Sequence, residues 1–207
     1  MHHPSISHRP RVAWRHPEAC AETPNAAAIT RQVQALVDMI CGRLPTPARE
    51  ILALDLQGVQ LLSEPSGPIC GFDANHVLIN VGDYAPSVDW RLSATHALLH
   101  CFGYAFMWSV VARMAGGDPQ RGSIADGRRG TPGYAWYQSF GDPTNGPNPY
   151  HAMTVRIADA LALAWGFGEE MGARVDTADL CAPSSADDEL IDSELAKVYW
   201  GLRRRLR

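Results

Sequence analysis

SATHALLHCFGYAFMW, residues 93 to 108, carries two histidines four positions apart, His96 and His100. Apolar residues surround them, and the segment is expected to be a helix. Residues four apart lie one turn above each other on the same helix face, so two imidazole nitrogens can point at one metal ion. Tetrahedral zinc takes nitrogen ligands of this kind. The alternative is that both are interior histidines, each hydrogen-bonded to a neighbouring carbonyl.

The segments before this helix predict a small sheet. A helix is expected at about 26 to 44, because apolar residues recur there at helical spacing. Three strands are then expected in EILALDLQGVQLLSE (50–64), PICGF (68–72) and HVLINV (76–81), the last two forming a hairpin around the polar turn DAN. The predicted fold class is therefore α+β, with a small, mostly antiparallel sheet packed on the histidine-bearing helix and on further helices.

A glycine- and proline-rich segment, residues 116–149, follows the histidine-bearing helix. A connection of this length without secondary structure is usually a functional lid or a disordered insert. Its aromatic residues Tyr134, Trp136 and Tyr137 are candidates for substrate binding, since they could line a peptide groove. The alternative is that these rings hold the loop against the surface.

The two ends of the chain have different predictions. Residues 1–22 contain His, Arg and Pro without the continuous apolar core of a secretory signal, and they are expected to be a disordered leader. Residues 23–207 are expected to form a single domain. This domain would include a second apolar helix at 149–167 and a final amphipathic helix at about 187–205.

Composition excludes several classes of protein. The chain has 207 residues, of which 46% are hydrophobic and 19% are charged, with a formal net charge of -4. These values are typical of a globular protein with one sizeable core. The mildly acidic balance does not favour a nucleic-acid partner. The longest apolar run, Cys101 to Ala112, is too short to span a bilayer, so no membrane span is expected.

The five cysteines are odd in number and widely spaced, and none forms a CxxC pair. This pattern argues against a disulfide framework and against a zinc ribbon. Buried free thiols in a reducing compartment are the preferred interpretation. A cytoplasmic or otherwise intracellular location is therefore expected.

Two segments resemble parts of a zinc metallopeptidase. Residues 76–103, HVLINVGDYAPSVDWRLSATHALLHCFG, resemble the edge strand, connecting loop and active-site helix of a zincin, whose helix has the motif HExxHxxG. Residues 155–167, VRIADALALAWGF, resemble the second helix of gluzincins, whose ExxAD pattern supplies a glutamate as third ligand. The resemblance implies a zincin-like fold, one bound zinc ion and hydrolysis of peptide bonds by metal-bound water.

The chain departs from the gluzincin pattern at the positions that matter most. Ala97 stands where the family has the glutamate that acts as general base, and alanine cannot move a proton. Val155 stands at the third-ligand position. Asp159 matches the aspartate that typically supports a ligand histidine in the family. His151 and Asp159 lie one helical turn on either side of Val155, and either could complete a metal site.

Each of these two residues also has an ordinary structural interpretation. His151 would be a residue of the first turn of a helix, and Asp159 a hydrogen-bonding carboxylate. Glycine at position 103 matches the zincin motif, although it could be a simple packing contact.

Two functions remain open at this point. The first is a metallopeptidase whose hydrolytic activity is lost or impaired through Ala97, acting on a peptide or protein substrate. The second is a non-catalytic pseudoenzyme that binds or assembles with a protein partner, which Val155 favours because a change at residue 97 alone would not explain a missing third ligand.

Overall fold

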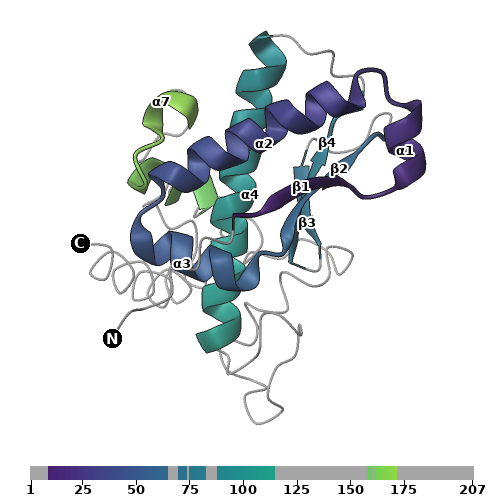
Figure 1. Cartoon of the computed structure of the whole chain (residues 1–207). Coiled ribbons are helices and arrows are strands. Elements are labelled where there is room, and N and C mark those ends of the chain that lie inside the picture. Colours follow the sequence, from purple (N-terminus) through teal and green to yellow (C-terminus); the bar gives the residue numbers. More distant parts are fainter. Residues whose placement is uncertain are drawn as a thin grey trace, which may run out of the picture.

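The computed structural model describes residues 9–64, 70–73, 75–82, 88–114, 158–159 and 161–171. These residues form a mixed α+β fold with a four-stranded sheet and several helices (Figure 1). The predicted loop at 116–149, the predicted C-terminal helix at 187–205 and most of the predicted helix at 149–167 lie outside the described residues. No helix in the described part of the chain is long and apolar enough to cross a membrane.

Residues 11–14 form a strand in the segment where a disordered leader was predicted. Strand β1 (Arg11–Trp14) pairs in parallel with strand β2 (Gly58–Leu62), and helix α1 (Pro17–Glu22) follows it. The prediction for residues 1–22 is therefore wrong from Arg11 onward. Sequence alone did not indicate this, because four residues of alternating exposure provide little hydrophobic pattern.

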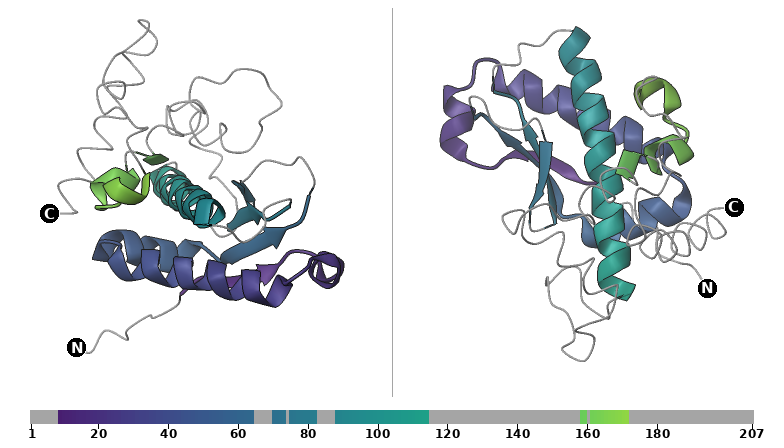
Figure 2. Two further views of the ribbon diagram at one scale, coloured as in Figure 1. Left: turned by 90° about the horizontal axis from the view of Figure 1, so that it is seen from above. Right: turned by 180° about the vertical axis from the view of Figure 1, so that it is seen from behind.

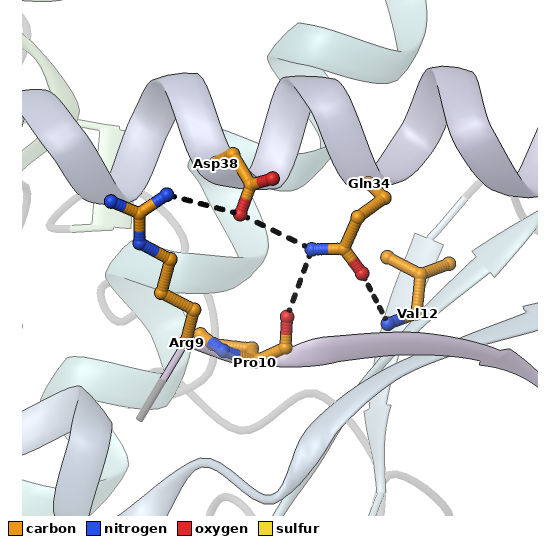
Figure 3. A network of polar contacts seen from close by, with 5 residues as sticks. All are labelled: Arg9, Pro10, Val12, Gln34 and Asp38. Carbon is orange, nitrogen blue, oxygen red and sulfur yellow. Dashed lines mark hydrogen bonds and ion pairs between the residues drawn. The ribbon is translucent and has the colours of Figure 1, made fainter. Parts of the chain in front are cut away.

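A polar network holds the N-terminal segment on helix α2 (Ala26–Arg43), as Figure 3 shows. The amide of Gln34 accepts a hydrogen bond from the Val12 backbone N–H at 2.9 Å and donates one to the Pro10 carbonyl at 3.2 Å. Gln34 also donates to Asp38 at 3.3 Å, and Asp38 forms an ion pair with Arg9 at 3.7 Å. One side chain thus satisfies both a donor and an acceptor of the strand.

Helix α3 (Thr46–Asp55) occupies the first half of the segment that was predicted as a strand. Pro47 lies in its first turn, where the missing N–H costs nothing. Ala48, Leu52 and Asp55 are buried at helical spacing, while Leu54 is 50% exposed. The prediction for residues 50–55 is wrong: the buried residues recur with a period near 3.6, which the short apolar run in the sequence did not distinguish from a strand. The strand begins only at Gly58.

The sheet order is β1-β2-β4-β3, where β3 is Cys70–Asp73 and β4 is His76–Asn80. The β3–β4 hairpin is antiparallel, as predicted, but the β1–β2 and β2–β4 pairs are parallel. The sheet is therefore not mostly antiparallel. Strand β4 is an interior strand, and β3 has the edge position that the resemblance suggested for β4.

The described core joins α2, α3, the sheet and helix α4 (Val88–Met114). Helix α4 passes behind α2 in Figure 1 and in front of it when the molecule is seen from behind (Figure 2). It also contacts strands β3 and β4. The largest fully buried side chains come from α2, from strands β2 and β4, from α4 and from residues 161–167: Phe102, Phe106, Phe167, Ile40, Leu61, Ile79, Leu98, Leu99, Met107, Leu161, Val33 and Val37.

Candidate functional site

Helix α4 carries both histidines of the opening motif, as the sequence predicts. His96 and His100 are each half-buried and lie four residues apart on this one helix. They therefore share a helix face. The site is built where this face meets the segment around Asp159.

Close backbone packing at Gly103 brings that segment to α4. A Cβ atom on Gly103 would lie 2.4 Å from the carbonyl oxygen of Ala158 and 2.8 Å from its Cα, which is closer than real Cβ contacts. Only glycine leaves room for the approaching backbone at this position. Gly103, one helical turn after His100, is thus a packing contact that brings the residue after Ala158 next to His100.

That residue, Asp159, contacts His100 directly. The distance from His100 Nδ1 to Asp159 Oδ1 is 2.7 Å, and both side chains are 22% exposed. A carboxylate can only accept a hydrogen bond, so Nδ1 carries the proton and the second ring nitrogen, Nε2, faces away from Asp159. This is how a carboxylate orients a metal-binding histidine.

The charge state of His100 is set by competing effects. Burial lowers the pKa of the imidazole, but the hydrogen bond and negative charge of Asp159 raise it by more, and the net shift is upward from 6.5. A metal ion at Nε2 would therefore compete with a proton there. The contact fits the supporting role that the resemblance implies for Asp159. Its other predicted role, as a direct ligand, stays a prediction.

A pair of thiols that sequence reasoning did not single out lies beside this contact. Cys70 begins strand β3, and Cys101 follows His100 on α4. Their side chains are close enough for each to shift the pKa of the other. Cys101 also donates to the carbonyl of Gly71 at 3.4 Å. The only available signals were the adjacency of Cys101 to His100 and a cysteine within a predicted strand.

The two thiols have different pKa values because their surroundings differ. The side chain of Cys101 lowers the pKa of Cys70 to about 7, with a further lowering from the nearby His100 imidazole. The side chain of Cys70, followed by burial, raises the pKa of Cys101 well above its ordinary value. Cys70 is therefore the more acidic member of the pair.

Ala97, the position of the missing base, belongs to the hydrophobic core and is 5% exposed. Zincins have a proton-carrying glutamate at the matching position of their motif. Here Ala97 contributes apolar packing.

Comparison with known protein families, with curated proteins and with solved structures finds no match to this chain. The site is therefore interpreted from its own geometry.

The described residues do not make up a metal site by themselves. Catalytic zinc sites use three protein ligands, and His96 and His100 would supply two. Within the described ranges, no group of three or more His, Cys, Asp or Glu is arranged to hold a metal ion. The remaining predicted residues, namely His151, Val155, Tyr134, Trp136 and Tyr137, lie outside these ranges, so their roles stay predictions.

Proposed function

We propose that this chain is a zincin-like protein of the gluzincin type, which binds zinc through His96 and His100 and has lost or impaired peptidase activity. The observation that carries the proposal is the 2.7 Å contact between His100 and Asp159. It joins the two segments on which the resemblance rests, although 59 positions separate these residues in sequence.

The local geometry supports this assignment in two steps. Gly103, the glycine of the motif, makes the close contact with Ala158, and Asp159 then reaches the second histidine. An interior histidine with a purely structural role would need a partner, but it would not need this glycine three residues further along the helix.

The two histidines of α4 could supply two of the three protein ligands that a catalytic zinc site needs. His100, with Nδ1 bonded to Asp159, has Nε2 available, and His96 lies one turn before it on the same face. A third ligand has to come from outside the described residues, where His151 is the predicted candidate. A zinc ion held there would supply a polarised water as nucleophile. Ala97 offers no group to take up the proton of that water.

A second candidate function is a non-catalytic module that binds a protein partner. The burial of Ala97 among core side chains favours it, since the position is used for packing. In this alternative, the surface beside α4 or the predicted loop at 116–149 would hold the partner without cleaving it.

Zinc content tests the proposal directly. The full chain, purified with added zinc, should hold about one zinc ion per molecule by elemental analysis, and replacing both His96 and His100 with alanine should abolish this. His16→Ala is the matched control, because His16 is an exposed histidine before helix α1 and should leave the zinc content unchanged. Wild-type protein without zinc would contradict the proposal and leave two structural histidines.

Asp159→Asn tests the orienting contact. Asparagine keeps the size of the side chain but loses the negative charge, so zinc affinity should fall by about 10- to 100-fold. Competition with a chelator of known affinity would measure the change. Unaltered affinity would mean that Asp159 does not support a metal ligand.

A further inference from the structure

Strand β3 lies along helix α4 and brings two cysteines together. The thiol of Cys101 on the helix donates a hydrogen bond at 3.4 Å to the carbonyl of Gly71, the strand residue next to Cys70. The two cysteines are 31 positions apart in sequence but adjacent in space. Both are free thiols.

Aromatic contacts fix the strand in this register on the helix. The ring of Phe72 lies 5.8 Å from the ring of Tyr104 and 6.3 Å from that of Trp108, measured between centroids. The indole of Trp108 donates to the Asn75 side chain at 2.9 Å, at the turn of the hairpin. These contacts hold the start of the strand, with Cys70, against the part of the helix that carries Cys101.

We propose that Cys70 and Cys101 form a redox-active dithiol, an oxidation site that closes into an intrachain disulfide when the protein meets hydrogen peroxide. In the first step, the sulfur of Cys70 attacks one peroxide oxygen, the O–O bond breaks, and the departing hydroxide takes up the thiol proton as water. The product is a sulfenic acid on Cys70.

In the second step, the sulfur of Cys101 attacks the sulfur of Cys70. The S–S bond forms, the S–O bond breaks, and hydroxide leaves with the proton of Cys101 as a second water. The two thiols together lose two electrons, and the peroxide oxygens gain them. A thiol reductant returns the pair to the dithiol, so the modification is reversible in a reducing compartment.

Exposure assigns the order of the two steps. Cys101 is 2% exposed and cannot meet the oxidant first, whereas Cys70 is half-buried at the start of the edge strand. Cys70 is thus the peroxide-reactive residue and Cys101 the resolving residue. This inference stands independently of any metal at His96 and His100.

The test uses the folded full chain, reduced, desalted and kept in a chelator so that no metal masks the thiols. After treatment with hydrogen peroxide, remaining thiols are alkylated and the protein is digested without reductant. Mass spectrometry should find the peptides of Cys70 and Cys101 joined, with two hydrogen atoms lost. A reductant applied before alkylation should separate them.

Two variants distinguish a specific pair from general oxidation. In Cys101→Ala, Cys70 should stop at the sulfenic acid, which a cyclic 1,3-diketone probe traps. Cys41→Ala is the control, because Cys41 is a buried thiol of helix α2 and its loss should leave the Cys70–Cys101 link intact.

Some outcomes would overturn the inference. If Cys70 and Cys101 stay alkylatable in wild-type protein while Cys20 is oxidised, the pair is not redox-active. A disulfide of Cys70 with another cysteine would refute the assignment of Cys101. Wild-type mapping alone decides both points, so a variant that fails to fold does not weaken the test.

Discussion

Gly103 shows how a single missing side chain shapes the candidate site. The carbonyl of Ala158 occupies the space that a Cβ atom would need, and the neighbouring Asp159 then reaches His100. Gly103→Ala should force the two backbones apart. Overpacking of this kind costs about 1–3 kcal/mol in the free energy of unfolding. Zinc affinity should fall as well, because the His100–Asp159 contact depends on the approach.

Gly42→Ala is the matched control for this substitution. Gly42 is exposed in helix α2, and a Cβ atom there would meet nothing within 4 Å. The change should be neutral or should stabilise the helix by roughly 0.5–1 kcal/mol. Urea unfolding of both variants measures the difference. If Gly103→Ala is as well tolerated as Gly42→Ala, close packing at Gly103 does not define the site.

Restoring the missing base is a second prediction for a single residue. In zinc-loaded protein, Ala97→Glu should raise peptide hydrolysis from undetectable to measurable, since a general base contributes about 10²- to 10⁴-fold. Because Ala97 is buried, the carboxylate should also lower stability by about 1–3 kcal/mol.

Ala97→Gln separates these two effects. Glutamine has nearly the same size but cannot take up a proton, so it should cost stability without restoring cleavage. Fluorogenic peptide libraries provide the activity measurement. Zinc binding without cleavage in Ala97→Glu would favour the binding module, and cleavage by wild-type protein would show that another base exists.

At the residue scale, sequence predicted what depends on local spacing. The placement of His96 and His100 on one helix could be predicted because residues 93–108 are mostly apolar and the two histidines are four positions apart. The approach of Asp159 to His100 came only through a resemblance, because no local rule relates residues so far apart. The pairing of Cys70 with Cys101 depends on the register of β3 along α4, which no motif encodes.

At the element scale, the predictions that failed concern segments whose hydrophobic pattern was ambiguous. The helix expected at 26–44 is α2, and the predicted hairpin is β3–β4. In residues 50–55, however, a short apolar run fitted a strand and a helix equally well. The hydrophobic pattern also could not predict the relative direction of the strands. The parallel β1–β2 pair depends on the three helices that connect these strands.

Arg43, the last residue of α2, links this helix to residues 166–170. Its guanidinium donates to the carbonyl of Gly166 at 2.9 Å, pairs with Glu170 and stacks on the ring of Phe167 at 4.3 Å. Gly166 has a φ of 88°, and its N–H bonds to the carbonyl of Leu163 as the helix ends. Arg43 thus binds the carbonyl of the residue that terminates the helix.

Removing this link should cost a modest and pH-dependent amount of stability. Arg43→Ala loses three contacts and should destabilise by about 1 kcal/mol. Glu170→Gln loses only the ion pair, and since Arg43 and Glu170 are 44% and 22% exposed, it should cost about 0.2–1 kcal/mol. Urea unfolding of both variants at neutral pH provides the comparison.

The pH dependence follows from the carboxylate. The hydrogen bond from Arg43 lowers the pKa of Glu170 below its ordinary 4.5. The ion pair therefore contributes fully above that ordinary value, and its contribution is lost as the pH falls through the lowered pKa. The difference between wild type and Glu170→Gln should shrink in acid. A constant difference would mean that the ion pair does not contribute.

At the scale of the whole molecule, the N-terminal segment is an integral part of the fold. Strand β1 adds a parallel edge to the sheet, and the indole of Trp14 donates to Thr30 of α2 at 3.0 Å. Val12 and Trp14 also pack against the core. Sequence analysis missed this because a four-residue edge strand is recognised by its partners more than by its own composition.

The last prediction tests whether β1 and α2 stabilise the molecule as one unit. A chain lacking residues 1–16 should unfold at lower urea than one lacking residues 1–8, because only the longer deletion removes β1. Size-exclusion chromatography should also show association of the shorter chain, since β2 then presents an unpaired edge.

Substitution of Gln34 tests the coupling more specifically, because two of its three hydrogen bonds go to Pro10 and Val12. In the chain that retains β1, Gln34→Ala should cost about 1–2 kcal/mol, and in the chain without β1 the same substitution should cost little. Equal costs in both chains would show that Gln34 acts within α2 alone and that β1 is not coupled to it.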